Sequence, residues 1–334
     1  MNKILPKVAW LTTNRTCNNK CKWCYTFNYN CNNKEMNFKK IKQIIDELSN
    51  FGVKKIILIG GEPTINNKII EIIKYIKEKN ILVSIASNGR KFSDISFTKK
   101  CKDIGLDFVN ISIKGVNEEE YISNTNSFGF NEMIKGYNNL IENGIETSLS
   151  YVITKNNEKE YENLKTMLND NNINYIFFML YKPSVDLDDK YNGPTMYELA
   201  NACKTVYEVF KDSDINIKFE MSLPLCILDK NLLDELLNKN MIATCCHISK
   251  GKGIIFDTDF NILPCNHFVD HPLNKNPILP SKIVSFWNSN ECSKFRKIVK
   301  TYPSIKCKNC DKWNICGGGC TLRWLKDNPN DIIK

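Results

Sequence analysis

Apolar residues follow two different spacings along the first two thirds of the chain. Short runs rich in Val, Ile and Phe, typical of buried strands, lie at residues 8–13, 54–61, 81–88, 108–115, 147–154, 174–181 and 215–221. Amphipathic segments with helical spacing lie between them, at residues 38–51, 67–80, 130–144 and 159–172. The order of these segments predicts strands that alternate with helices.

This alternation predicts the fold class. Near-continuous apolar strands joined by helices indicate an α/β protein with a parallel sheet, either an open doubly wound sheet or a full or partial barrel. Both place chemistry at the carboxyl ends of the strands. Polar and cysteine-containing motifs follow the first four strands here, so we expect a site at that edge of the sheet.

The pattern changes after residue 220. Residues 253–265 resemble a hairpin that turns around Asp257 to Asn261, and the tail is rich in cysteine with little periodicity. We therefore expect two domains, a sheet domain at residues 1–220 and a small metal-supported module at residues 221–334.

Composition narrows the cellular setting. The chain has 334 residues, 15 cysteines and a formal net charge of +9, and its lysines are scattered rather than gathered in one run. A nucleic-acid partner is therefore not expected. We find no export signal and no apolar run of eighteen residues, which predicts a cytoplasmic protein without a membrane span. In that compartment cysteines serve metal or redox chemistry more often than disulfides.

Cys17, Cys21 and Cys24 form the first cysteine group, directly after the first strand. Three thiolates around one metal centre leave a coordination position open for a substrate, whereas a structural site normally closes with four. The alternatives are a zinc site that a remote residue completes, or three unrelated buried cysteines.

The spacing C-x3-C-x2-C, with Trp23 and Tyr25 beside the third cysteine, resembles the radical S-adenosylmethionine (SAM) enzymes. The resemblance implies a partial (β/α)6 TIM-like barrel and a [4Fe–4S] cluster on these three cysteines. It also implies that SAM chelates the fourth iron and is cleaved by one electron to methionine and a 5′-deoxyadenosyl radical.

The same resemblance implies SAM-binding positions at the ends of later strands. Gly60, Gly61, Glu62 and Pro63 match the family's GGEP motif, which holds the amino group of SAM. Ribose and carboxylate contacts are expected from Ser87, Asn88 and Ser112. Lys114 has three open roles: a salt bridge to the SAM carboxylate, a substrate contact, or a solvated lysine. Ile153 is either part of the adenine platform or a core residue.

A second cysteine group, Cys307, Cys310, Cys316 and Cys320, has the spacing C-x2-C-x5-C-x3-C, which indicates a metal site, with zinc as the alternative to iron–sulfur. It resembles the SPASM extension of radical SAM enzymes, which binds auxiliary [4Fe–4S] clusters. By that resemblance Cys265, Cys320 and one or both of Cys245 and Cys246 hold a first auxiliary cluster. Cys307, Cys310 and Cys316 hold a second.

Two departures from the SPASM pattern affect these expectations. Phe260 stands where the family's hairpin has glycine, which is tolerable if the turn is reshaped. No cysteine follows Cys320, so the second auxiliary cluster either has an open iron, borrows a ligand, or is missing. The candidates for a borrowed ligand are Cys226, Cys292, His267 and Asp327. Cys101 and Cys203, on helical patterns, are expected to be core residues.

The resemblance predicts a maturase that forms a thioether or carbon–carbon crosslink in a ribosomally made peptide. Asn266, where the sulfatase-maturing branch has an aspartate, argues against formylglycine formation. Alternatives are a SAM-dependent dehydrogenase or epimerase acting on a small metabolite or peptide residue, and a non-catalytic metal-binding module. Expected partners are the peptide and a reductant such as flavodoxin or ferredoxin. Because the cysteines begin at residue 17, either a separate leader-peptide-binding protein is a further partner, or the substrate is small enough to need none. No general acid or base is assigned.

Overall fold

The computed structural model describes residues 4–26, 34–154, 160–185, 193–243, 246, 251–299 and 301–333. Contacts divide the chain into two compact units, and each contains a stretch from both halves of the sequence. The first unit comprises Met1–Thr147 and His247–Ile298, and the second comprises Ser148–Cys246 and Val299–Lys334. The predicted boundary at residue 220 stays a prediction.

The first unit is built on a sheet with the strand order β10-β9-β1-β2-β3-β4. Its strands are β1 (Val8–Thr12), β2 (Lys55–Ile59), β3 (Leu82–Ser87), β4 (Phe108–Ile113), β9 (Gly253–Phe256) and β10 (Ile262–Leu263). All neighbours pair in parallel except β10, which forms an antiparallel hairpin with β9. The hairpin is the one predicted from the sequence, and β9 adds it to the sheet beside β1.

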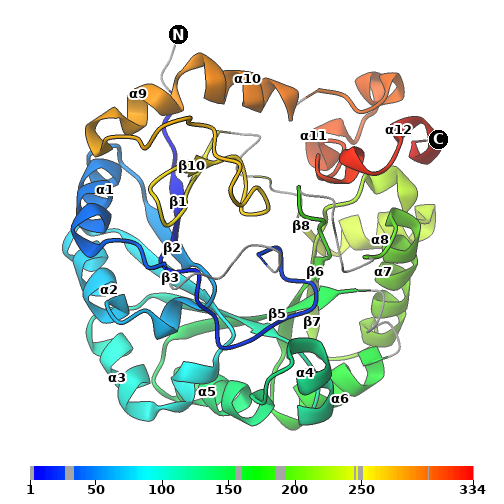
Figure 1. The fold of residues 1–334 in the computed structure, drawn as a ribbon. Coiled ribbons are helices and arrows are strands. Elements are labelled where there is room, and N and C mark those ends of the chain that lie inside the picture. The colour runs from blue at the N-terminus through cyan, green and yellow to red at the C-terminus, as the bar shows by residue number, and fades with distance from the viewer. Residues whose placement is uncertain are drawn as a thin grey trace. The chain divides into compact units, whose positions relative to one another are not determined.

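Helices cover the outer face of these strands (Figure 1). They are α1 (Phe38–Asn50), α2 (Ile69–Glu78), α3 (Ile95–Asp103), α4 (Glu118–Thr125), α5 (Phe130–Glu142), α9 (Ile283–Trp287) and α10 (Asn290–Ile298), with short 3-10 turns at Pro63–Ile65, Arg90–Ser93 and Pro280–Lys282. The apolar stripe of α1, formed by Ile41, Ile44, Ile45 and Leu48, is buried as predicted. Asn37 caps this helix by accepting a hydrogen bond from the Lys40 amide.

The second unit contains β5 (Glu146–Ile153, except its first two residues), β6 (Tyr175–Leu180), β7 (Asn216–Glu220) and β8 (Ile242–Ala243) in that spatial order, paired in parallel. Its helices are α6 (Tyr161–Asp170), α7 (Met196–Phe210), α8 (Lys230–Asn238), α11 (Trp313–Cys316) and α12 (Pro329–Ile332). Short 3-10 turns lie at Leu225–Ile227, Ile305–Asn309 and Arg323–Leu325. The strand–helix alternation therefore continues through α8 and β8, and the expectation that it ends at residue 220 was wrong.

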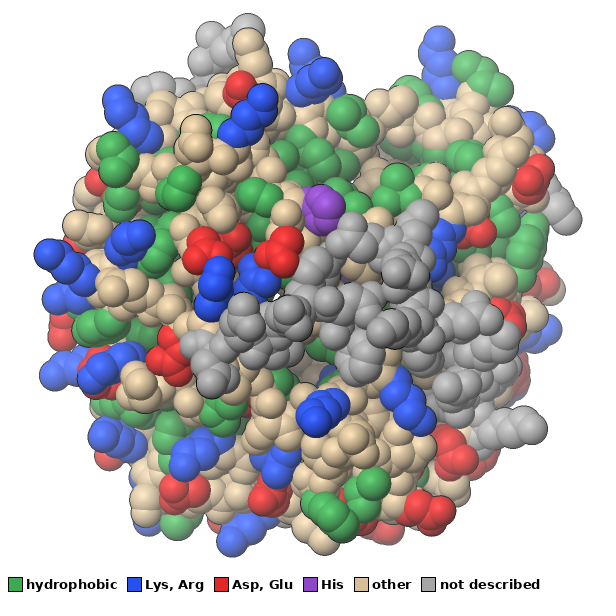
Figure 2. Space-filling view, in the orientation of Figure 1, with side chains coloured by type: hydrophobic (Ala, Val, Ile, Leu, Met, Phe, Trp, Pro, Cys, Tyr) green, Lys and Arg blue, Asp and Glu red, His purple; other side chains and the backbone are tan. Residues whose placement is uncertain are grey.

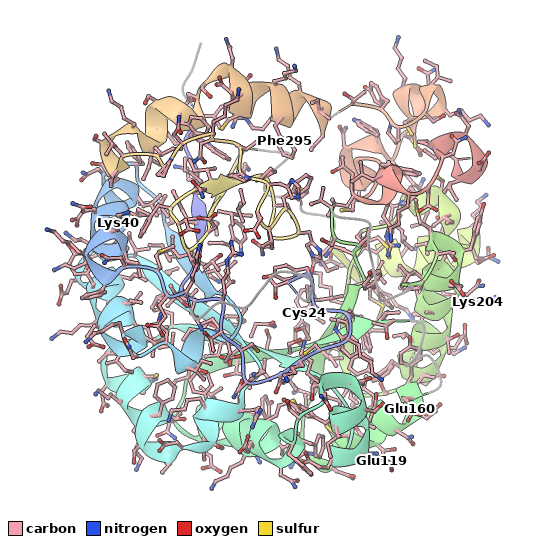
Figure 3. The ribbon with its side chains drawn as sticks, in the orientation of Figure 1. Cys24, Lys40, Glu119, Glu160, Lys204 and Phe295 are labelled. Carbon is pink, nitrogen blue, oxygen red and sulfur yellow. The ribbon has the colours of Figure 1, made fainter. Side chains whose placement is uncertain are left out.

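The architecture confirms the predicted fold class. Among the described residues neither set of strands closes on itself, and each carries helices on one face, the arrangement typical of barrel-type α/β folds rather than of a doubly wound sheet (Figure 1). In Figure 3, Lys40 lies on the outer face of α1, whereas Cys24 lies on the opposite side of the strands. The inner side is therefore the side that carries the cysteine loop.

Two surface properties bear on partners. Among the side chains coloured in Figure 2, Lys and Arg are interspersed with Asp and Glu and form no patch of one sign. Among the described residues, no helix has the length and apolar character that crossing a bilayer requires.

Candidate active site

The first cysteine group lies on a loop that leaves the carboxyl end of β1. The base of this loop is closed by an antiparallel bridge between Asn14 and Glu35, and the Arg15 amide donates to the Lys34 carbonyl at 2.9 Å. Residues 27–33, within the loop, lie outside the described part of the chain. The bridge fixes where the three cysteines begin relative to the sheet.

The thiols of this loop are partly buried. Burial raises the pKa of Cys17 to about 12 and that of Cys21 to about 11, and the neighbouring thiols add to both shifts. Lys114 opposes the shift at Cys21. Because burial disfavours an uncompensated thiolate, these thiols become good ligands only when a bound cationic centre offsets the charge.

The donor set fits an iron–sulfur cluster. No group of three or more His, Cys, Asp or Glu side chains in the described ranges is arranged to hold a metal ion. A [4Fe–4S] cluster has a different requirement, because each cysteine binds a different iron and the sulfurs stand apart. Cys17, Cys21 and Cys24 influence one another electrostatically, as thiols grouped around one cluster do.

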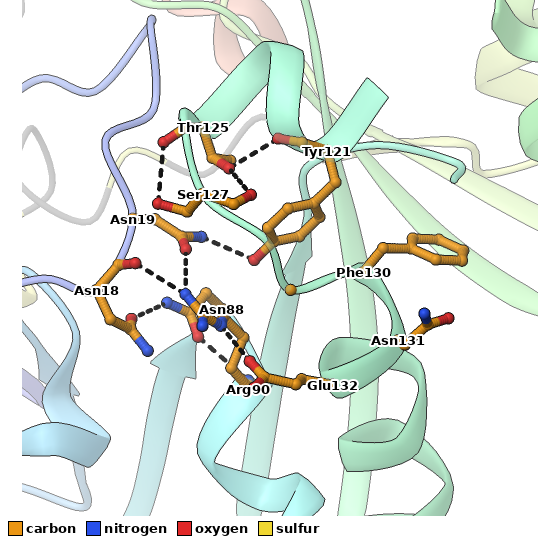
Figure 4. Close-up of polar contacts among 12 residues, drawn as sticks. Asn18, Asn19, Asn88, Arg90, Tyr121, Thr125, Ser127, Phe130, Asn131 and Glu132 are labelled. Atoms are coloured by element: carbon orange, nitrogen blue, oxygen red, sulfur yellow. Dashed lines mark hydrogen bonds and ion pairs between the residues drawn. The ribbon is translucent and has the colours of Figure 1, made fainter. Parts of the chain in front are cut away.

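Arg90 ties the cysteine loop to the end of β3 (Figure 4). Its Nη1 donates to the Asn18 carbonyl at 2.8 Å and to the Asn19 Oδ1 at 2.9 Å, while its Nε pairs with Glu132 of α5 at 2.5 Å. The Asn88 side chain donates to Asn18 Oδ1 at 2.7 Å. One guanidinium thus links the residues directly after Cys17 to two elements of the scaffold.

Helix α4 holds the next part of the loop. The fully buried Tyr121 accepts a hydrogen bond from the Asn19 side chain at 2.8 Å (Figure 4). Backbone amides of Lys20 and Lys22 donate to the carbonyls of Thr125 and Asn124 at 2.8 and 3.0 Å. The sequence did not reveal Arg90, Asn19 or Tyr121 as site residues, because an arginine after SNG and a buried tyrosine carry no signature.

Glu62 of the GGEP motif is 2% exposed and is saturated with hydrogen bonds from the protein. Its Oε1 accepts from the Thr64 amide, the Thr64 hydroxyl and the Ser87 hydroxyl, and its Oε2 accepts from the Asn88 amide at 2.7 Å. Burial nevertheless raises its pKa above the ordinary value. The carboxylate therefore joins the ends of β2 and β3, and its contact with SAM stays a prediction.

Gly60 and Gly61 are required by the protein's own backbone. A Cβ at Gly60 would overlap the Asn14 carbonyl, and one at Gly61 would overlap the Thr16 carbonyl. The close approach arises because the Gly61 and Glu62 amides donate to those two carbonyls, each at 2.8 Å. Pro63 then begins a short 3-10 turn. Small residues at these positions need no ligand to explain them.

Of the remaining predicted SAM positions, some form hydrogen bonds within the protein and one is buried in the core. Ser87 donates to Glu62 and accepts from the Gly89 amide, whereas Lys114 donates to the Ser112 hydroxyl at 2.7 Å. The Lys114 ammonium also lies 5.8 Å from the ring centre of Trp23 in the cysteine loop. Ile153, at the end of β5, is fully buried. Their roles toward SAM stay predictions.

A small cavity of about 30 Å³ lies beside the GGEP motif in the first unit. Its lining includes Arg15, Tyr25, Gly60, Gly61, Asp257 and Asn266. The Oδ1 atom of Asn266 is buried and accepts no hydrogen bond from the described residues. The Tyr25 ring centre lies 4.9 Å from that of His267. Burial raises the pKa of the Tyr25 hydroxyl, and the nearby thiols of Cys24, Cys265 and Cys17 raise it further.

Two carboxylates that could serve as acid or base have structural partners. Asp257 accepts hydrogen bonds from the Asp259 and Asn261 amides and so closes the β9–β10 hairpin. Glu220 pairs with Lys182 at 2.9 Å.

Phe260 adopts φ +69° in the hairpin, so the turn keeps the left-handed backbone that glycine favours instead of being reshaped. Burial of the ring and the Lys40 ammonium 4.8 Å above it offset that strain.

The second cysteine group lies in the second unit on short turns. The Cys310 amide donates to the Cys307 carbonyl and the Trp313 amide donates to the Cys310 carbonyl, which passes the chain from one cysteine to the next. Gly317, Gly318 and Gly319 all have positive φ and reverse the chain before Cys320. These residues form no sheet, and their geometry depends on local turns.

The other predicted auxiliary ligands are distributed as follows. Cys320 is buried enough to raise its pKa, and the charge of Cys246 adds to that shift, so these two predicted partners lie near each other. Cys265 belongs to the first unit, and Cys245 lies outside the described residues. Cys101 and Cys203 are fully buried on α3 and α7, which confirms their prediction as core residues.

Comparisons with known proteins identify the family and relatives of this chain's first half. Residues 11–168 match the family model described as the Radical SAM superfamily. The chain is 32% identical over 174 residues to an Fe-coproporphyrin III synthase of Methanosarcina barkeri, covering 52% of this chain and 43% of that protein. It is 28% identical over 152 residues to a probable GTP 3′,8-cyclase of Saccharolobus islandicus, covering 45% of this chain and 49% of that protein. The chain thus spans under half the length of these relatives.

Solved structures share the fold over nearly the whole chain. SuiB of Streptococcus suis bound to S-adenosylmethionine superposes with a TM-score of 0.75 at 18% identity, over 98% of this chain and 76% of that one. The structure of anSMEcpe with bound AdoMet and the Kp18Cys peptide superposes with a TM-score of 0.73 at 17% identity, over 95% and 90%. At such identities the likeness concerns the fold.

Proposed function

Since residues 11–168 of this chain match the Radical SAM superfamily, we propose that the protein cleaves SAM reductively and abstracts hydrogen from a ribosomally made peptide to form a crosslink. The family implies a [4Fe–4S] cluster and SAM as cofactors. The observation that carries the proposal is the scaffold around Cys17, Cys21 and Cys24, which Arg90 and α4 hold at the carboxyl ends of β1 and β3.

The chain's own residues have three tasks in this reaction. Cys17, Cys21 and Cys24 would hold the cluster, which supplies one electron to the sulfonium of SAM. Glu62 keeps the β2 and β3 ends at a fixed distance, so that backbone groups of Gly60 and Gly61 meet the ligand in a constant geometry. Lys114, a cation beside Cys21, is placed to attract a carboxylate such as that of SAM.

The crosslink closes with a defined balance of atoms. Bound SAM would supply the group that takes one hydrogen atom from a peptide carbon and leaves as 5′-deoxyadenosine. Bond formation from that carbon to a cysteine sulfur or a second carbon would release one proton from the partner atom and one electron, which an auxiliary cluster or the oxidised form of the reductant would accept. The product is two hydrogen atoms lighter than the peptide.

The experiment is a SAM cleavage assay on the anaerobically reconstituted protein with dithionite. We expect 5′-deoxyadenosine in the wild type, and its absence would overturn the radical SAM proposal. Adding a candidate precursor peptide should then give a product two mass units lighter. An unchanged mass with an inverted residue would indicate epimerisation instead.

A small metabolite is the second candidate substrate. The relatives named Fe-coproporphyrin III synthase and GTP 3′,8-cyclase favour it, because their names refer to a porphyrin and a nucleotide rather than to peptides. Peptide substrates are favoured by the structures solved with the precursor peptide SuiA and the Kp18Cys peptide. Screening both classes for stimulated 5′-deoxyadenosine formation separates the two candidates.

A further inference from the structure

Residues 222–226 pack directly on the second cysteine group. The Cys320 amide donates to the Ser222 carbonyl at 2.8 Å, and the Leu225 amide donates to Cys316 Sγ at 3.3 Å. Gly319 approaches this segment so closely that a Cβ would stand 2.8 Å from the Pro224 nitrogen. Cys226 follows Leu225 directly, so its backbone lies beside Cys316.

The thiol of Cys226 lies within the same electrostatic neighbourhood. Burial of its sulfur raises its pKa, and the thiols of Cys316, Cys307 and Cys310 raise it further. The pKa of Cys307 is likewise raised by burial and then by Cys316 and Cys310. Cys226 is an exposed residue, so its thiol is accessible to a cluster bound beside it.

Cys320 falls outside this set. After burial, the charges that act on its thiol belong to Lys182, Cys246 and Arg323. Lys182 and Arg323 lower its pKa, whereas Cys246 raises it. By the resemblance to the SPASM extension, Cys320 is expected to hold the first auxiliary cluster, which leaves Cys307, Cys310 and Cys316 for the second.

We propose that Cys226 is the fourth protein ligand of an iron–sulfur cluster on Cys307, Cys310 and Cys316. The contact between the Leu225 amide and Cys316 Sγ places the Cys226 segment against this cysteine group. Four thiolates close every iron of a [4Fe–4S] cluster. Such a cluster transfers electrons or braces the tail, and it does not bind substrate through an open iron.

The proposal goes beyond the function proposed above, because it concerns a cluster that takes no part in binding SAM. Its test uses the full chain with Cys17→Ala, Cys21→Ala and Cys24→Ala as background, which removes the SAM cluster from the count. Into this background we would introduce Cys226→Ala, Cys226→Ser or, as the matched control, Cys203→Ala. Cys203 is also in the second unit but is a core residue of α7.

Iron and sulfide per chain and the EPR spectrum are measured after anaerobic reconstitution. We expect about eight irons in the background and in the Cys203→Ala control, from two auxiliary clusters. The Cys226→Ala variant should keep about four irons, or about seven with the EPR signal of a [3Fe–4S] cluster, at an unchanged far-UV circular dichroism spectrum. The Cys226→Ser variant should give an intermediate iron content, because a hydroxyl is a weaker iron ligand.

Two results would overturn the proposal. One is an iron content and EPR spectrum of Cys226→Ala that match those of the Cys203→Ala control. The other is zinc in place of iron on the second cysteine group. Neither outcome touches SAM cleavage by the intact protein, so failure of this proposal and failure of the proposed function are observed separately.

Discussion

The two cysteine groups differ in how the protein supports them. Cys17 and Cys21 lie on a loop that Arg90, Asn88 and Tyr121 hold from three elements of a parallel sheet and its helices. Cys307, Cys310 and Cys316 lie on single turns, and Cys310 is exposed. We therefore expect the described part of the first loop to keep its shape without metal, and the second region to gain much of its structure from the cluster proposed for it.

The largest effect is expected from the triple variant Cys17→Ala, Cys21→Ala, Cys24→Ala. SAM cleavage should fall to background and iron by about four atoms per chain, because the cluster loses every protein ligand. The thermal unfolding midpoint should stay close to that of the apo wild type, since the loop is held by other residues. A large fall in the midpoint would contradict the comparison.

The equivalent change in the second group, Cys307→Ser, Cys310→Ser, Cys316→Ser, should act on local structure. We expect residues 301–333 to become about 100-fold more sensitive to limited proteolysis, because opening is no longer coupled to metal release. The control is Cys203→Ala, which replaces a cysteine of the same unit, and the protease should cleave it at the wild-type rate. Equal protease resistance of the triple variant would show that the turns suffice without metal.

Glu62→Gln tests the buried carboxylate that supports the first region. The glutamine NH2 group would face the Asn88 amide donor, so we expect a loss of about 2 kcal/mol in the free energy of unfolding. Because burial raises the pKa of Glu62, the folded state binds the proton more tightly than the unfolded state does. The stabilisation of the wild type by protonated Glu62 is therefore lost as the pH rises above 4.5, the ordinary pKa of this carboxyl group. The deficit of the variant should therefore shrink as the pH is raised above 4.5 in denaturant titrations.

Arg90→Gln gives the smallest expected effect, confined to the loop. Losing the guanidinium bonds to Asn18 and Asn19 should raise the alkylation rate of Cys17 and Cys21 in the apo protein about tenfold, through more frequent local opening. Cys101, buried in α3, reports global unfolding and should label no faster. Lys77→Gln, which removes a half-buried cation paired with Asp107, is the matched control. Faster labelling of every cysteine would show that Arg90 supports the fold as a whole.

The strands could be predicted from sequence because their apolar runs are long, and several of them end at or just before Gly or Asn. The GGEP and cysteine motifs could be placed at strand ends for the same reason. The continuation through α8 and β8 was missed because β8 has only two residues, Ile242 and Ala243, and leaves no periodic signal. The Asn19–Tyr121 and Arg90–Asn19 contacts join residues that are 102 and 71 positions apart in the chain. Such contacts depend on how side chains meet in the folded protein, and no local sequence pattern predicts them.

The packing of Gly60 and Gly61 against the carbonyls of Asn14 and Thr16 limits what saturation mutagenesis can reveal at these codons. Every replacement adds a Cβ that must push the first strand's extension away, so all nineteen alternatives should score as inactive whether or not a cofactor touches the motif. A selection for activity would then rank these positions with the cluster cysteines. Only a direct measurement of cofactor affinity distinguishes a glycine kept for the ligand from one kept for the strand beside it.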